Sequence, residues 1–391
     1  MNVSSILNRF LAAVTPRTMH PARFQALLLT VESLLSCQAC YVTAIGRNLK
    51  AKTSEKHCIK RVDRLLSNGN LARECTAIYH ALMNRIVTQD HPIILVDWSH
   101  ADSNNKYCLL RASIICEGRA LTLYQQTTST AHYHCPQQQK HFLSILKAML
   151  PETCRPVLVT DAGFKVPWFK QVRRLGWHYV GRVRGNAYIQ KDGSDEMVTV
   201  KSLYKSQKRS CQLLGDITLT KSHEFKTHAV LIGKGHKLLK RDTNQKYKEP
   251  WFLVSSLPKH QNFLKKTIKI YSTRMQIELA FRDQKSARFG LSSELHRTVK
   301  PIRVKILMLI AMLAHWFNIL LGMTVEYMGK ASSFQANTVK HKRVLSWHFL
   351  GMRQWQTKRF EIPIAEMKEA FKWLKARQEE LNWKTLELDN D

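Results

Sequence analysis

Two short apolar segments, each followed by an aspartate, constrain the fold of this chain most strongly. Pro92–Val96 leads into Asp97, and Pro156–Thr160 leads into Asp161. A continuous apolar run of strand length indicates a strand that is covered on both faces, and therefore a central strand with helices on each side. Two such strands ending in aspartate would place both carboxylates at one edge of a sheet, where ligands bind in open α/β sheets.

The sequence around these two strands predicts an α/β core followed by an insertion. The predicted elements are strands at 107–116 and 120–125, a helix at 137–150, a helix after Asp161 and a strand at 177–183, in the order β-β-β-α-β-α-β. Residues 186–250 are lysine-rich with short alternating runs, which predict a β-rich insertion. After residue 258 the patterns are helical, and the last helix is expected at 364–382.

The charge of the chain narrows the choice of partner. It carries 61 Lys and Arg against 29 Asp and Glu, a net charge of +32, yet 44% of its residues are hydrophobic. That apolar content can build a large core, so the excess charge must lie on surfaces. Repulsion among these positive surface charges favours a polyanionic partner. Nucleic acid is preferred as that partner over an acidic substrate or an anionic membrane. The apolar segment 306–321 is expected to be a buried helix rather than a membrane span.

Nine cysteines at scattered positions, and no signal-peptide pattern at the N-terminus, predict a reducing, cytoplasmic compartment. Cys37 and Cys40 form one CxxC pair, and His132–Cys135 resembles a ligand cluster. No second pair follows at zinc-ribbon spacing. Buried thiols and loop histidines are therefore the preferred interpretation over a metal site.

Residues 1–88 are predicted to be helical, and a basic segment lies within them. Between Arg47 and Arg64 the chain has a strong excess of Lys and Arg, and Ser54 is a good N-cap for the second of two short helices. Two short helices joined by a polar turn, the second one basic, are typical of a helix-turn-helix DNA reader. The candidate DNA contacts are Arg47, Lys60, Arg61 and Arg64. A plain helical bundle with a solvated basic face remains the alternative.

A stripe of charged residues is predicted on a later helix. Steps of 3, 4, 4 and 3 residues place Tyr271, Arg274, Glu278, Arg282 and Lys285 within an arc of about 80° on one helix. One interpretation is a surface face with i,i+4 ion pairs.

The other interpretation joins Glu278 to the two strand aspartates. Asp97, Asp161 and Glu278 together could hold two divalent cations for phosphoryl transfer, and hard oxygen ligands suit Mg²⁺. A polymerase, a nuclease or a strand transferase needs such a set.

Stretches along most of the chain match one family. They are GRNL (46–49), KRVDRLL (60–66), LVDWS (95–99), LRAS (110–113), TDAGFKVPW (160–168), RVRG (182–185), KEPW (248–251), YSTRMQIELAFRDQKS (271–286) and FQANTV (334–339). With them the chain resembles the bacterial DDE transposases of insertion sequences. It is most similar to the cut-and-paste branch that includes the transposases of the tetracycline- and kanamycin-resistance transposons. The steps of 3, 4 and 7 residues from Tyr271 to Lys285 match that branch's Y-R-E-K signature.

The resemblance implies an RNase H-like core and a role for each matching residue. Asp97, Asp161 and Glu278 would be the catalytic metal ligands for two Mg²⁺ ions, with Mn²⁺ as a possible substitute. Tyr271, Arg274 and Lys285 would bind DNA phosphates, and Arg182 and Arg184 would line the DNA channel. In this branch a nicked end forms a hairpin that is reopened before joining to target DNA, and Trp251 matches the residue that holds the flipped base. An ordinary core tryptophan is the alternative for Trp251.

The sequence thus predicts five segments. They are a DNA-end-binding domain at 1–88, the two parts of the RNase H-like core at 89–185 and 251–325, the β-rich insertion at 186–250 and a C-terminal helical region at 326–391. The expected partners are double-stranded DNA, as terminal inverted repeats and target, and a second copy of the chain in a synaptic complex. The expected location is the cytoplasm, at the nucleoid.

The spacing of Ile364, Met367, Phe371 and Leu374 suits either dimerisation or a helix that caps its own domain. The alternative functions are a non-catalytic end-binding protein and an RNase H-like nuclease.

Overall fold

The computed structural model describes residues 3–204, 211–220, 222, 224–233, 250–259, 261–336, 338–339 and 342–386. The chain forms two compact units, each built from several segments. The first contains residues 1–88, 98–133 and 276–379, and the second contains residues 89–97, 134–275 and 380–391. The lysine-rich segment 234–248 of the predicted insertion lies outside the described residues. The division of the chain into the five segments described above stays a prediction.

The N-terminal part of the first unit is helical, as predicted. Its helices are α1 (Val3–Val14), α2 (Pro21–Cys37), α3 (Val42–Arg47), α4 (Glu55–Leu66) and α5 (Gly69–Ile86). Ser54 is the N-cap of α4, but its hydroxyl bonds to Nδ1 of His57 rather than to a backbone amide. A Cβ on Gly46 would lie 2.6 Å from Cα of Ile59, so a glycine is required where α3 touches α4. The short helix pair predicted from the sequence is therefore tightly packed.

The rest of the first unit surrounds one long apolar helix. The antiparallel strands β2 (Tyr107–Ile114) and β3 (Leu121–Ser129) form a hairpin. α11 (Pro301–Tyr327) packs against α2, α4, α5, α12 (Trp347–Thr357) and β3. α11 is long and apolar enough to cross a membrane, but its apolar window is fully buried inside the protein, as expected for 306–321. Further elements are η1 (Thr130–His132), η3 (Ser293–Leu295), η4 (Ala331–Phe334), α10 (Met275–Lys285) and α13 (Ile364–Leu386).

The second unit is built on a mixed sheet. Its strands follow in the order β1-β4-β5-β10-β9-β8-β6-β7, and β1, β4 and β5 are parallel. The bounds are β1 (Ile93–His100), β4 (Val157–Thr160), β5 (His178–Val183), β6 (Tyr188–Lys191), β7 (Met197–Thr199), β8 (Cys211–Leu219), β9 (Phe225–Ile232) and β10 (Trp251–Ser255). The described part of the predicted insertion is β-rich, with one short helix, α8 (Val200–Tyr204).

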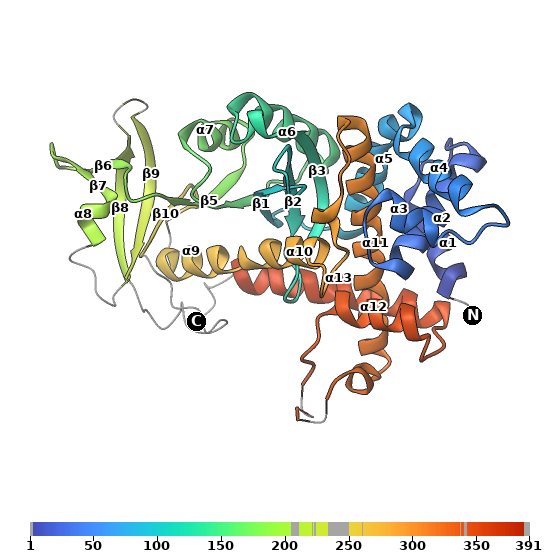
Figure 1. Ribbon diagram of the computed structural model, residues 1–391. Helices are drawn as coiled ribbons and strands as arrows, with labels where there is room; N and C mark the ends of the chain where they lie inside the picture. The colour runs from blue at the N-terminus through green and yellow to red at the C-terminus, as the bar shows by residue number, and fades with distance from the viewer. Residues whose placement is uncertain are drawn as a thin grey trace. The chain divides into compact units, whose positions relative to one another are not determined.

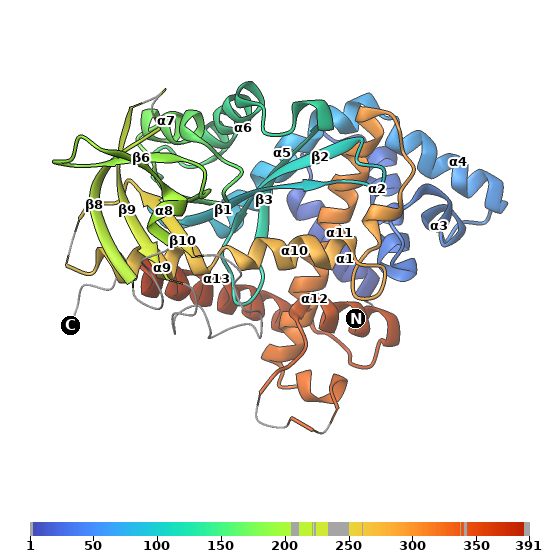
Figure 2. The same ribbon diagram turned by 60° about the vertical axis from the view of Figure 1, so that its left-hand side comes forward.

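Helices cover both faces of the central strands, which explains why those strands are apolar throughout. α6 (Pro136–Met149) and α7 (Val166–Arg174) lie on one side of β4 and β5, and α9 (Phe263–Ser272) lies on the other (Figure 1, Figure 2). All residues of β4 are buried. The predicted β-β-β-α-β-α-β order is present, and the predicted fold class, α/β with an RNase H-like core, is confirmed.

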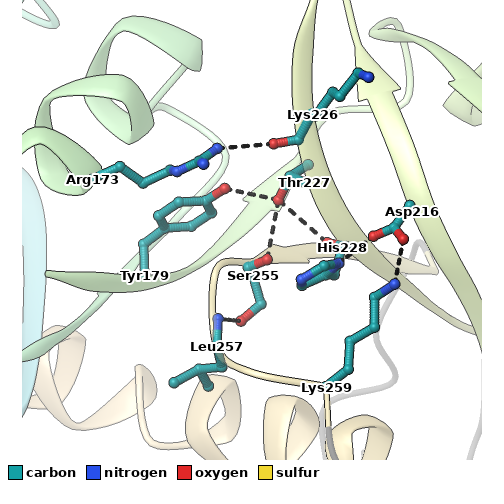
Figure 3. A network of polar contacts seen from close by, with 9 residues as sticks. All are labelled: Arg173, Tyr179, Asp216, Lys226, Thr227, His228, Ser255, Leu257 and Lys259. Carbon is teal, nitrogen blue, oxygen red and sulfur yellow. Dashed lines mark hydrogen bonds and ion pairs between the residues drawn. The ribbon is translucent and has the colours of Figure 1, made fainter. Parts of the chain in front are cut away.

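A polar network fixes the inserted strands to the core of the second unit (Figure 3). The hydroxyls of Tyr179 on β5 and Thr227 on β9 are 2.7 Å apart, and Thr227 Oγ1 also donates to the carbonyl of Ser255 on β10. Asp216 on β8 is bound by His228 at 2.5 Å and by Lys259. These side-chain hydrogen bonds therefore join β9 of the insertion to the core strands β5 and β10.

Candidate active site

Asp97 lies on β1, and Asp161 directly follows β4, the parallel strand beside β1. β1 pairs with β4 in a register that places Val96 opposite Thr160, so the two aspartates follow at the next position. Asp97 is buried, at 8% exposure. The sequence predicted that both strands end at their aspartate, and this is wrong for β1, which continues to His100. The residue after Asp97, Trp98, is also buried, which suits a continued strand.

The turn after Asp161 brings a histidine to the site. Oδ1 of Asp161 accepts a hydrogen bond from the amide of Gly163 at 2.9 Å. A Cβ on Gly163 would lie 2.5 Å from Cε1 of His134, so only glycine lets this ring approach. Burial lowers the pKa of His134, and the charge of Asp161 acts in the opposite direction. Sequence reasoning treated His134 as a loop residue and missed this contact, because nothing in the pattern links it to a glycine so far along the chain.

The predicted single helix from Tyr271 to Lys285 is in fact two helices, and the prediction is wrong on this point. α9 ends at Ser272, and α10 begins at Met275. The hydroxyl of Ser272 donates to the carbonyl of Lys269, and that of Thr273 donates to the carbonyl of Ile270. Side chains that bond back to the preceding turn compete with the helix ladder, so these two bonds favour the end of α9 at this point.

Arg274 lies in this break and beside Asp97. Nη1 of Arg274 lies 3.5 Å from Oδ2 of Asp97, and both side chains are at most 15% exposed. The guanidinium also lies 5.9 Å from the centre of the Tyr271 ring. Tyr271 is 3% exposed, and burial raises the pKa of its hydroxyl, against the opposing charges of Arg274 and Arg182. The charge of Asp161 also acts on this hydroxyl. Asp97, Asp161, Tyr271, Arg274 and Arg182 therefore form one site in the second unit.

Trp251 borders this site, and Arg182 and Arg184 lie at the end of β5. The ring of Trp251 meets that of Tyr271 edge to face, with centroids 4.9 Å apart, and Trp251 is 5% exposed. Arg182 lies on β5, and Nη2 is 3.5 Å from the carbonyl of Pro250. The predicted alternation of two arginines on one strand is wrong in detail, because β5 ends at Val183 and the exposed Arg184 follows it.

Glu278 and Lys285 lie on α10. This helix belongs to the first unit from residue 276 onward. Nζ of Lys285 is 6.0 Å from the centre of the Phe281 ring. Within the described ranges, no group of three or more His, Cys, Asp or Glu side chains is arranged to hold a metal. The adjacent carboxylates of Asp97 and Asp161 do suit a hard divalent cation in donor chemistry, since oxygen ligands are what Mg²⁺ prefers.

The predicted N-terminal DNA contacts lie on α3 and α4. Arg47 ends α3 and is paired with Glu55 at 2.9 Å, with both side chains exposed. Lys60 and Arg64 are exposed on α4, and Arg61 is half-buried. Arg61 and Arg64 line a surface hollow of about 440 Å³ together with residues of α2.

Comparison with known proteins identifies the family of this chain. The family model described as "Transposase DDE domain" matches residues 88–317, which is more than half of the chain. The chain belongs to the transposase DDE domain family. This membership implies an enzyme that cleaves DNA, and the family generally uses divalent metal ions. Asp97, Asp161, Trp251, Tyr271, Arg274, Glu278 and Lys285 all fall within the matched residues.

The other comparisons add less. No curated protein matches. Among solved structures, the chain is similar to the piggyBac transposase in its cryo-EM synaptic complex with hairpin DNA. The identity is 12% and the TM-score 0.42, over 99% of this chain and 82% of that one.

Proposed function

We propose that this DDE transposase is a cut-and-paste enzyme of the bacterial insertion-sequence type that nicks transposon ends, forms and reopens a DNA hairpin, and joins the ends to target DNA. The observation that carries the proposal is the position of Asp97 and Asp161, which follow the paired residues Val96 and Thr160 of parallel strands, with Arg274 3.5 Å from Asp97. A carboxylate pair with a neighbouring cation suits a site that binds both a divalent cation and a phosphate.

In the proposed mechanism, Asp97, Asp161 and Glu278 would hold Mg²⁺. When bound, the ions supply Lewis-acid stabilisation of the charge that develops on the attacked phosphate. The guanidinium groups of Arg274 and Arg182 would neutralise the phosphate oxygens of the cleaved strand. Burial keeps the Tyr271 hydroxyl protonated, so it can donate a hydrogen bond to a phosphate oxygen. Lys285 would bind a further phosphate.

The hairpin step is assigned to Trp251. A hairpin requires tight bending and unstacked bases, and an aromatic face can hold an unstacked base. The indole packs on Tyr271, so a base held there would lie beside the residue proposed to bind the phosphate. Arg184, exposed after β5, would contact the DNA backbone.

End recognition is assigned to the N-terminal helices. Arg47, Lys60, Arg61 and Arg64 lie on a closely packed helix pair, and four cations on such a pair suit a DNA backbone and groove. We further propose a homodimer in the synaptic complex and a cytoplasmic, nucleoid-associated location. Of the predicted seam on α13, Leu374 is buried within the chain, whereas Ile364, Met367 and Phe371 are half-buried and would be the seam residues available for a dimer contact.

The test uses DNA that flanks the coding region, as duplexes containing each candidate terminal repeat. With Mg²⁺, the purified protein should nick at the repeat boundary and then produce a hairpin on a denaturing gel, and chelation should stop both. Binding should weaken steeply with salt, by about 0.9 log unit per log unit of salt for each phosphate contact. Binding without cleavage would instead identify a non-catalytic end-binding protein, and cleavage without hairpin or joining would identify a nuclease.

A further inference from the structure

The face of α10 opposite Glu278 carries buried polar side chains. At about 100° per residue, Glu278, Arg282 and Lys285 share an arc of about 60°, and Gln276, Asp283 and Gln284 lie on the opposite side. Asp283 and Gln284 are only 3% and 2% exposed. Burying polar side chains is costly unless they are hydrogen-bonded, so these residues need partners within the first unit.

The turn of the β2–β3 hairpin binds α10 at both ends. The side-chain carbonyl of Gln276 accepts from the amide of Cys116 at 2.8 Å, and its backbone carbonyl accepts from the amide of Ala120 at 3.3 Å. About two turns later, Oδ2 of Asp283 accepts from Nε of Arg119 at 2.6 Å, in a pair whose side chains are 4% and 14% exposed. One short turn therefore contacts the first and the last turn of the same helix.

The strands of the same hairpin make a second attachment. Oε1 of Gln284 accepts from Nη2 of Arg111 at 2.6 Å. Arg111 is fully buried, and its guanidinium also donates twice to Oε1 of Gln125 on β3, at 2.7 and 3.0 Å. Gln125 in turn donates to the carbonyl of Met308 on α11. The guanidinium lies 4.2 Å from the centre of the Phe281 ring on α10.

We infer that Asp283–Arg119 and Gln284–Arg111 are positioning contacts for DNA cleavage. They fix the rotation of α10 about its axis and its position along that axis, and so hold the side chain of Glu278 in the orientation that cleavage requires. The inference rests on the proposed catalytic role of Glu278. Two attachments on one side of a short helix prevent it from turning about its axis, and a side chain on the other side is then held by the rigid backbone. A misplacement of about 1 Å can reduce a rate about 100-fold.

The experiment compares two carboxylate-to-amide substitutions in the first unit. Asp283→Asn weakens the attachment of α10. Glu74→Gln is the matched control, since Glu74 is also paired with an arginine, Arg23, at 2.6 Å and is partly buried, but joins α5 to α2. Asp283→Asn should slow single-turnover nicking by about 10- to 100-fold while leaving the affinity for end DNA unchanged. Glu74→Gln should nick at the wild-type rate.

A second readout needs neither metal nor DNA. Amide hydrogen exchange in α10 should be faster in Asp283→Asn, whereas exchange in α5 should stay as in the wild type. Arg119→Lys keeps a cation beside Asp283 and should retain more of the nicking rate than Arg119→Gln.

Wild-type nicking by Asp283→Asn, unchanged exchange in α10, or equal losses in Asp283→Asn and Glu74→Gln would each overturn the inference. Glu278→Gln separates this failure from that of the proposed function. If Glu278→Gln cuts DNA at the wild-type rate, or if the wild type does not cut DNA, the proposed function fails. Amide hydrogen exchange in α10 then still decides whether the two contacts fix the helix.

Discussion

Arg274 and Asp97 are 177 residues apart in the chain, and their side chains are 3.5 Å apart in the structure. Arg274 lies in the two-residue break between α9 and α10, and Asp97 lies on β1. A cation beside a carboxylate in a largely buried site can bind a phosphate when the carboxylate binds a divalent cation.

Arg274→Gln is expected to slow DNA nicking by about 100-fold, because it removes a donor aimed at the charge of the transition state. The affinity for end DNA should change much less, since other cations bind the backbone. Single-turnover nicking and a binding titration measure the two effects. Arg173→Gln, on α7 in the same unit, is the control and should leave the nicking rate unchanged. A parallel loss of rate in both variants would contradict a specific role for Arg274.

Trp251→Phe is expected to nick DNA normally and to accumulate less hairpin. Phenylalanine retains an aromatic contact with Tyr271, but offers a smaller face to an unstacked base. Trp251→Ala should also lower the free energy of unfolding by about 3–5 kcal/mol, because it empties a buried site. Gel analysis of the products and chemical denaturation check the two predictions. A wild-type hairpin yield in Trp251→Phe would assign Trp251 to the core alone.

Acid is expected to destabilise the first unit through His348. The ring is fully buried, 4.9 Å from that of His315, and burial lowers the pKa of His348 to about 3. In the unfolded chain this pKa is near 6.5, so the unfolded state binds more protons between these values. The free energy of unfolding should therefore fall as the pH drops below about 6.5, by about 2 kcal/mol from this group at pH 5. In His348→Leu, the free energy of unfolding should fall less between pH 7 and pH 5 than in the wild type. Urea denaturation at both pH values measures this difference.

Gly322→Ala is expected to prevent stable folding. A Cβ on Gly322 in α11 would lie 1.8 Å from the carbonyl oxygen of Trp347 in α12, and backbone atoms cannot move aside cheaply. Gly69→Ala is the matched control, because a Cβ there meets nothing within 4 Å at the start of α5. Alanine should be neutral or stabilising at that position, by up to about 1 kcal/mol. Thermal unfolding compares the two variants, and equal midpoints would contradict the close packing of α11 on α12.

Much of the fold follows from local patterns that the sequence displays directly. The apolar run before Asp161 indicated a strand covered on both faces, and β4 is buried throughout. The same logic placed both aspartates at the edge of one sheet, and the structure pairs β1 with β4 in parallel. These features are predictable because burial on both faces acts on every residue of a short segment.

Contacts between distant segments were not predictable. The helical spacing from Tyr271 to Lys285 continues through the break after α9, because a break of two residues leaves the periodicity intact. The polar residues Asp283 and Gln284 are buried beside the remote Arg119 and Arg111, and no local pattern reveals such contacts. Likewise, His134 reaches the site only because Gly163 has no side chain.

The three carboxylates carry the central claim, and one measurement tests it most directly. Asp97→Asn, Asp161→Asn and Glu278→Gln keep the size of each side chain and remove its charge. Each should bind end DNA as tightly as the wild type and show no nicking in Mg²⁺ or Mn²⁺ under single-turnover conditions. Nicking at the wild-type rate by any one of the three would contradict the assignment of that residue to the active site.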